Sequence, residues 1–316
     1  MRARVPAVGF TLVVLGASLF ILNAGVSRVA LRAGVDPLLL TTVRVTGTFV
    51  VLLVVAGLFR PSALRPPGGR LGLALLVHGV IGVAALQWTY FVAIDRLPVG
   101  MALLLEYQAP ILVALWARFV QKERVRRRMW LGLALAWGGL VAATGIWHGL
   151  RFDGWGVLAG IGAALCFCVY FLVGEHGVGR LDPLRVVLWS FAVATVALNL
   201  VDPVWSLSGG LLDDSADLRG RLAGHLPVWL VLAWVVVLGT VVPFAVELAA
   251  LRHLSATTVT MVAMLEPIGV NVLGWVWFRE SLGLVAFLGG VAVVAGILLA
   301  QSARRRHLVV EPPQLT

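Results

Sequence analysis

The chain alternates long apolar runs with short polar gaps along almost its whole length. A transmembrane helix needs about 20 apolar residues to cross the hydrocarbon core of a bilayer, and ten runs reach or approach this length. The gaps contain residues that end helices, such as Asp36-Pro37 and Asp182-Pro183. The pattern therefore predicts an all-α membrane protein with ten transmembrane helices, at residues 8–30, 37–59, 71–94, 98–119, 129–147, 154–174, 184–201, 227–250, 256–277 and 283–301.

The second half of the sequence repeats the first. The segment Asp36-Pro37-Leu38 recurs 146 residues later as Asp182-Pro183-Leu184. Further along the offset is 157, and the matched pairs include Pro110 and Pro267, Glu123 and Glu280, Gly132 and Gly289, and Gly139 and Gly296. Five helices in each copy is an odd number, so the second copy must be inverted in the membrane relative to the first. We expect two inverted five-helix repeats, at residues 1–148 and 149–303, followed by a cytoplasmic tail at 304–316.

Composition supports a lipid environment. The chain is 60% hydrophobic and only 13% charged, whereas soluble domains carry about 25% charged residues. A net charge of +10 could indicate a nucleic-acid partner. Here, however, the basic residues lie in the short gaps between apolar runs, which is typical of membrane orientation. We therefore expect the lipid bilayer, and no nucleic acid, as a partner.

The distribution of charge predicts the orientation. Five basic residues lie between Lys122 and Arg128, but only one lies between Arg279 and Val285, the corresponding loop of the second copy. Because cytoplasmic loops are enriched in Lys and Arg, the first loop should be cytoplasmic and the second external. Both termini should then be cytoplasmic, and the acidic segment Asp213–Asp217 should lie in a short external loop.

Several spaced motifs resemble the EamA type of the drug/metabolite transporter superfamily, over essentially the whole chain. They are Arg44 in the second span, Ala93–Pro98, Pro110, Lys122-Glu123, Pro243-Phe244, Glu266-Pro267 and Arg279-Glu280. Within that family, Val99–Tyr107, Pro243–Glu247 and Met264–Pro267 are similar to the threonine/homoserine exporter branch. The resemblance implies movement of small molecules, most often export of amino acids or other metabolites, without a bound cofactor.

Two charged residues near the middle of predicted spans are the main candidates for substrate binding or coupling. Glu106 lies deep in the fourth span, where an ionised carboxylate costs about 3 kcal/mol or more, so it should face a cavity or a partner, or carry a proton. Its counterpart is Ala263, so the fold itself does not require the carboxylate. Arg44 in the second span needs an acceptor, either a carboxylate such as Glu106 or Glu266 or an anionic group of the substrate. A packing hydrogen bond for Glu106 and a permanent ion pair or snorkelling for Arg44 are the structural alternatives.

Other polar and aromatic residues within the spans could complete a site for a zwitterion. Each of them also has a structural interpretation, since polar side chains join helices in membranes. Glu247 could snorkel from a helix end, and Glu266 could satisfy backbone groups freed by Pro267. The further candidates are Asn23, Gln87, Tyr90, Tyr107 and Tyr170.

Pro110 and Pro267 occupy matched positions in the fourth and ninth spans. Proline lacks a backbone donor, so we expect a kink at each position and propose a gating role for both. The glycine-rich faces at Gly138-Gly139 and Gly289-Gly290 should allow close helix packing and could also support a homodimer.

Together these observations predict a secondary transporter of the inner (plasma) membrane that exports amino acids or related small polar metabolites by alternating access. The alternatives are an importer or a drug or nucleotide-sugar carrier of the same fold, and a polytopic membrane enzyme acting on a lipid-linked substrate. The six histidines are scattered and the two cysteines lie within one apolar run, so we expect no metal, no cofactor and no catalytic residues. No glycine-rich nucleotide-binding loop is present in the sequence, which argues against direct use of ATP.

Overall fold

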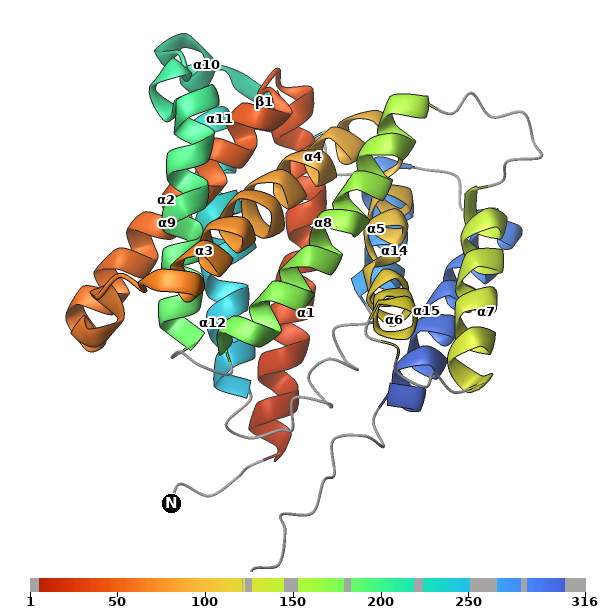
Figure 1. Ribbon diagram of the computed structural model, residues 1–316. Helices are drawn as coiled ribbons and strands as arrows, with labels where there is room; N and C mark the ends of the chain where they lie inside the picture. The colour runs from red at the N-terminus through yellow and green to blue at the C-terminus, as the bar shows by residue number, and fades with distance from the viewer. Residues whose placement is uncertain are drawn as a thin grey trace, which may run out of the picture.

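The computed structural model describes residues 6–120, 122, 127–144, 153–178, 183–218, 224–250, 266–279 and 283–304. This part of the chain is almost entirely helical, and the β structure described in it is one short antiparallel pair of strands (Figure 1). Large apolar side chains lie on the outer faces of the helices as well as between them, for example Leu58 (72% exposed) and Leu200 (81% exposed). Such an apolar exterior requires a lipid environment.

The described residues of the first half form seven α-helices and two short non-α segments. They are α1 (Pro6–Arg32), α2 (Pro37–Phe59), the single-turn helix η1 (Pro61–Leu64), α3 (Gly69–Val77), the π-helical segment η2 (His78–Ala85), α4 (Leu86–Arg96), α5 (Val99–Glu106), α6 (Ala109–Phe119) and α7 (Arg127–Thr144). Helices α3, η2 and α4 form one continuous run.

The second half has the same order of long elements, with an insertion after its second long helix. Its elements are α8 (Gly154–Val178), α9 (Pro183–Val201), η4 (Val204–Ser206), α10 (Gly209–Asp213), β1 (Ser215–Asp217), β2 (His225–Pro227), α11 (Val228–Val236), the π-helical segment η5 (Val237–Val241), α12 (Val242–Ala250), α14 (Glu266–Phe278) and α15 (Leu284–Arg304).

The predicted spans coincide with helices wherever the structure describes them, apart from a break at Tyr107-Gln108 in the fourth. Within the described ranges, four helical runs are long and apolar enough to cross a membrane: Ala7–Arg32, Pro37–Phe59, Gly69–Arg96 and Leu184–Val201. Shorter apolar helical stretches lie at Val99–Val113, Gly154–Tyr170, Val228–Val241 and Phe287–Gly296. Residues 256–265 of the predicted ninth span lie outside the described residues.

Local sequence explains where the first two helices meet. Gly34 has a φ of +96°, a conformation that favours glycine, and it turns the chain at the end of α1. The carboxylate of Asp36 then accepts a hydrogen bond from the backbone N–H of Leu38 at 2.8 Å, and Pro37 occupies the first turn of α2. This is the N-cap and proline arrangement that begins a helix.

The polar gap between α9 and α11 is more structured than the short loop that we expected from the sequence. Ser208 caps α10 by accepting a hydrogen bond from the N–H of Leu211. Strands β1 and β2 then pair antiparallel, with Ser215 opposite Pro227. The indole Nε1 of Trp277 donates to the carbonyl of Leu218 at 2.9 Å, so α14 anchors this hairpin.

Two π-helical segments occupy matched places in the two halves. Gly82 in η2 and Gly239 in η5 are 157 residues apart, the offset that relates the later part of the repeat. A Cβ on Gly82 would press on the backbone of Tyr170 in α8, and one on Gly239 would overlap the side chain of Asn23 in α1. Each π-segment therefore packs closely on the first helix of the opposite half.

Helices α7 and α15 lie side by side along one edge of the molecule (Figure 1). A Cβ on Gly139 would lie 2.6 Å from the carbonyl oxygen of Gly289, and one on Gly296 would lie 2.5 Å from that of Gly132. The close packing expected at these glycines is thus present, and it joins two helices of the same chain. Gly138, by contrast, has open space around its α-carbon.

The loops after the fourth and ninth spans share an unusual backbone conformation. Lys122 (φ 57°) and Arg279 (φ 56°) are the non-glycine residues with positive φ in the described part of the chain. They are 157 residues apart. Equivalent cationic residues therefore adopt the same left-handed conformation in the two halves.

Candidate functional site

The fourth span breaks at the residues that carry its polar side chains. Helix α5 ends at Glu106, α6 begins at Ala109, and Pro110 lies in the first turn of α6. A residue at position 110 would normally donate its N–H to the carbonyl of Glu106, and proline cannot. The side-chain Nε2 of Gln108 donates instead to the carbonyl of Leu104 at 2.9 Å. The helix thus breaks at Tyr107-Gln108, directly before the position where the sequence predicts a kink.

This break faces the start of α14. The hydroxyl of Tyr107 donates to Oε2 of Glu266 at 2.9 Å, across 159 positions of sequence. Glu266 immediately precedes Pro267, the repeat counterpart of Pro110. The two proline-containing segments of the repeat thus meet through a tyrosine and a carboxylate.

Arg44 is held by two residues that come from different elements. Its Nε donates to the hydroxyl of Thr240 in η5 at 2.8 Å, and its guanidinium lies 5.5 Å from the centre of the Phe91 ring in α4. The residue is 8% exposed. These contacts fix the plane of the guanidinium and leave its two terminal nitrogens without a hydrogen bond to any residue that the structure describes.

Glu106 and Tyr90 lie within electrostatic range of Arg44, and Glu266 lies within range of Tyr90 and Tyr107. Within the described ranges, Glu106 accepts no hydrogen bond and Arg44 forms no ion pair within 4.0 Å. The sequence offered a carboxylate such as Glu106 or Glu266, or a substrate anion, as the acceptor for Arg44; among the described residues, its Nε donates to the Thr240 hydroxyl. We call Arg44, Tyr90, Glu106, Tyr107 and Glu266 the central polar cluster.

Asn23 lies close to the central polar cluster. It is 4% exposed and packs against Gly239, the neighbour of Thr240. Its Oδ1 is buried without a hydrogen-bond partner, and so is Oε1 of Gln87. Buried polar atoms are usually hydrogen-bonded, so these two oxygens are available to a ligand or to water.

Tyr170 lies further away, in an aromatic row. The Tyr107 and Phe167 ring centres are 6.4 Å apart, those of Phe167 and Tyr170 are 5.9 Å apart, and those of Tyr170 and His78 are 4.6 Å apart. The row thus leads from the central polar cluster to η2. There Nδ1 of His78 lies 2.8 Å from the hydroxyl of Ser190 in α9.

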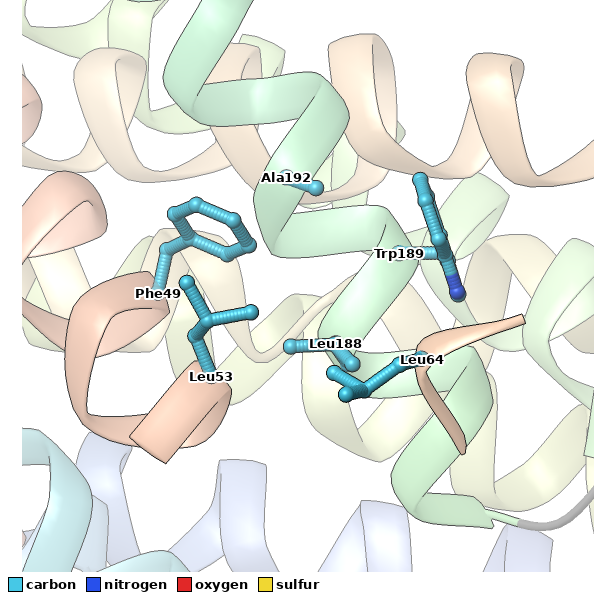
Figure 2. A pocket seen from close by; sticks show the side chains of 6 residues that line it. All are labelled: Phe49, Leu53, Leu64, Leu188, Trp189 and Ala192. Atoms are coloured by element: carbon cyan, nitrogen blue, oxygen red, sulfur yellow. The ribbon is translucent and has the colours of Figure 1, made fainter. Parts of the chain in front are cut away.

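The described structure leaves some of the predicted site residues unplaced. The side chains of Glu247, Pro110 and Pro267 lie outside the described residues, although the helices that carry them are described. No group of three or more potential metal ligands occurs in the described part of the chain. The pocket shown in Figure 2 lies between α2, η1 and α9 and contains no member of the central polar cluster.

Comparison with known proteins decides the family. Two segments, residues 7–145 and 154–301, match the EamA-like transporter family. The chain belongs to that family. Its two matches cover nearly the whole sequence and correspond to the two halves described above.

Relatives of this EamA protein are named as transporters. It is 27% identical over 285 residues to an uncharacterized transporter of Archaeoglobus fulgidus, covering 89% of this chain and 92% of that one. It is 26% identical to the threonine/homoserine exporter RhtA of Salmonella typhimurium (81% of this chain, 79% of that one) and 25% identical to RhtA of Escherichia coli (77% and 75%). A crystal structure aligned over 95% of this chain and 98% of the other, with a TM-score of 0.57 and 20% identity, shares the fold.

These comparisons identify the EamA protein as a transporter in a membrane and not an enzyme, so the alternative of a membrane enzyme is set aside. Sequence analysis overlooked Thr240 and Ser190, because hydroxyl residues in apolar spans are common and carry no motif. One feature of the sequence points to Thr240: it directly follows Gly239, which is matched in the repeat by Gly82.

Proposed function

We propose that the protein is a secondary transporter that exports amino acids or related small polar metabolites across the plasma membrane by alternating access. The observation that carries the proposal is the central polar cluster. It brings one arginine, two carboxylates and two tyrosine hydroxyls together at the break in the fourth span, where elements of both halves meet. Family membership supports transport, and the cluster supports a substrate that carries both a negative and a positive group.

The architecture that we propose is ten transmembrane helices in two inverted five-helix repeats. The packing between halves supports this arrangement, because contacts occur in pairs related by the repeat offsets. The contact of Gly139 with Gly289 has its counterpart in the contact of Gly296 with Gly132. A Cβ on Gly47 would press on Val236. In the repeat, Gly47 corresponds to Val193 and Val236 corresponds to Gly79. The counterpart contact is present, because a Cβ on Gly79 would press on Val193. Such reciprocity is expected if a two-fold axis relates the halves.

In this proposal Arg44 binds the carboxylate of the substrate. Thr240 and Phe91 fix the guanidinium, and the terminal nitrogens remain to donate two parallel hydrogen bonds. Planar, bidentate binding of carboxylates is the contact for which arginine is best suited. The unpartnered Oδ1 of Asn23, which packs on Gly239 beside Thr240, would accept a hydrogen bond from the polar part of the substrate, and the buried Oε1 of Gln87 is a further candidate acceptor.

The two acids supply the opposite charge. Tyr107 orients Glu266, whereas Glu106 has no hydrogen-bond partner among the described residues and is available to a substrate ammonium group or to a proton. A proton released from Glu106 when the ammonium group binds would couple export to the proton gradient. A zwitterionic α-amino acid carries both the carboxylate that Arg44 would bind and the ammonium group that Glu106 would bind.

Transport requires the site to open, because Arg44 and Tyr90 are both buried. The break at Tyr107-Gln108 and the π-segments η2 and η5 interrupt regular helical hydrogen bonding close to the cluster. Irregular segments of this kind are frequent at functional sites in helices and let broken helices rearrange in transporters. We propose that these segments, with Pro110 and Pro267, open the cluster alternately to the two sides.

The proposed direction is outward, with both termini in the cytoplasm. The basic loop at 122–128 supports the orientation, and the printed name of the threonine/homoserine exporters supports the direction and the substrate class. The test is counterflow in proteoliposomes that contain the purified full chain. Threonine, homoserine and other neutral amino acids are compared with analogues that lack the carboxylate or the amine. Exchange that needs both groups is expected. Equal exchange of the analogues, or none with any amino acid, would refute the proposed substrate class.

A further inference from the structure

The pocket shown in Figure 2 is formed by residues of α2, η1 and α9. Its volume is about 270 Å³, and its lining is apolar: Phe49, Leu53, Leu64, Leu188, Trp189 and Ala192. Leu53 is 43% exposed and Leu64 is 36% exposed, so the pocket is open to the surroundings. The indole of Trp189 donates to the carbonyl of Ala63 at 3.1 Å and thereby fixes η1 over the pocket.

Two arginines lie next to lining residues at one end of this pocket. Arg65 directly follows the lining residue Leu64. Arg185 lies one turn before Leu188 on α9 and donates to the carbonyls of Arg65 and Pro66 at 2.8 and 3.2 Å. Because carbonyl groups are uncharged, these hydrogen bonds do not neutralise the positive charge of Arg185. The apolar pocket therefore ends beside Arg65 and Arg185, where α2 and α9 leave the apolar zone.

The opposite end of the helix pair α2 and α9 is filled by a hydrogen-bonded side chain that the pocket end lacks. At the repeat offset of 146, Leu53 corresponds to Asn199 and Ala192 corresponds to Thr46. There the Nδ2 of Asn199 donates to the Thr46 hydroxyl at 2.9 Å, and its Oδ1 accepts from the N–H of Val204 in η4. A hydrogen-bonded side chain fills that end. The pocket end has two aliphatic side chains and an opening, and there the exposed Ser206 is replaced by Arg60.

We propose that this pocket binds one acyl chain of an anionic phospholipid, with the phosphate headgroup held by Arg65 and Arg185. The volume is below the roughly 300–1,000 Å³ of sites that enclose a whole small molecule, and it suits part of one chain. The lining offers no polar group that would orient a polar substrate. Clusters of basic residues at the membrane surface bind anionic lipid headgroups. The apolar pocket and the arginines beside it therefore both favour an anionic phospholipid.

The test measures which phospholipid stays bound to the purified full chain. Detergent-solubilised protein is incubated with phosphatidylglycerol or with phosphatidylcholine carrying the same acyl chains, and retained lipid is counted by native mass spectrometry. Wild-type protein should preferentially retain one phosphatidylglycerol. Ala192→Trp fills the pocket and should abolish this preference. Arg65→Gln should weaken it about fivefold, the contribution expected of one basic residue near a lipid surface.

Two matched controls make the result specific. Val196→Trp adds the same bulk one turn further along α9, where Val196 is 61% exposed, and should leave retention unchanged. Arg70→Gln removes an exposed arginine that does not adjoin the lining and should also leave it unchanged. Equal retention of both lipids by wild-type protein, or loss of the preference in the controls as well, would show only general lipid association and overturn the proposal. None of these measurements depends on transport.

Discussion

Arg44 and Thr240 form a hydrogen bond that couples a charged side chain to a π-helical segment. The Nε of Arg44 donates to the Thr240 hydroxyl at 2.8 Å, and this hydroxyl donates in turn to the carbonyl of Val235 at 2.9 Å, five residues earlier. A π-segment disturbs the regular bonding of carbonyl groups, and Thr240 satisfies one of them while it orients the arginine. The geometry of η5 and the direction of Arg44 are therefore linked through one oxygen.

This link predicts the effect of two substitutions at Thr240. Thr240→Val keeps the shape but removes the hydroxyl, so the apparent KM for an amino acid should rise roughly tenfold or more, the effect of losing a hydrogen bond to a charged group. Thr240→Ser should behave nearly like wild type. The measurement is proteoliposome flux against substrate concentration. A change in maximal flux alone, with KM unchanged, would show that Thr240 does not position a substrate-binding Arg44.

Glu106 offers the sharpest test of the charge in the site. Glu106→Gln keeps size and hydrogen-bonding capacity, so the protein should fold normally. Transport should fall roughly tenfold or more, because a charge-assisted contact contributes about 1.5–3 kcal/mol. Glu106→Asp should retain part of the activity, and the pH dependence of flux should flatten in the Gln variant. Unchanged flux and unchanged pH dependence in Glu106→Gln would reduce Glu106 to a packing residue.

The helices could be predicted from the sequence because lipid imposes a simple length rule. The break near Pro110 and the close contacts at Gly139 and Gly289 also followed from residue type, since proline removes a donor and glycine permits close approach. These features depend on local chemistry or on the repeat.

The partners of the site residues could not be predicted in the same way. Sequence analysis proposed a carboxylate or a substrate anion as the acceptor for Arg44 and did not foresee that the Thr240 hydroxyl accepts from its Nε. Thr240 is 196 positions away, in a π-segment that no local pattern reveals. Charge identifies which residues need partners, but the register between two helices decides which atoms meet. The hairpin between α9 and α11 was missed for a related reason, because Trp277 on a distant helix anchors it.

The orientation of the repeats predicts opposite exposure for two equivalent loops. Ser62 in η1 lies between Arg60 and Arg65 in the sequence, and Ser206 in η4 lies four residues after Asp202. Both serines are exposed. In a background with Cys166 and Cys168 replaced by alanine, Ser206→Cys should react with a membrane-impermeant maleimide added outside, and Ser62→Cys should react only after permeabilisation. Equal labelling of the two cysteines in intact cells would contradict the inverted arrangement.

The contact between α7 and α15 predicts that adjacent glycines differ sharply. A Cβ on Gly139 would lie 2.6 Å from the Gly289 oxygen, and one on Gly296 would lie 2.5 Å from the backbone of α7. Backbone atoms cannot move aside cheaply, so Gly139→Ala and Gly296→Ala should each lower the free energy of unfolding by about 1–3 kcal/mol.

Gly138 and Gly290 provide the matched controls for these variants, because a Cβ at either position would meet nothing within 4 Å. Alanine there should be neutral or slightly stabilising, since alanine favours helix over glycine by about 1 kcal/mol. Thermal and denaturant unfolding in detergent measure all four variants. Gly139 and Gly296 are also repeat counterparts that make reciprocal contacts. A two-fold arrangement therefore requires the two alanine variants to lose similar amounts of unfolding free energy. A large loss at one and none at the other would mean that the two contacts are not equivalent, and the reciprocity would then no longer support the inverted repeat.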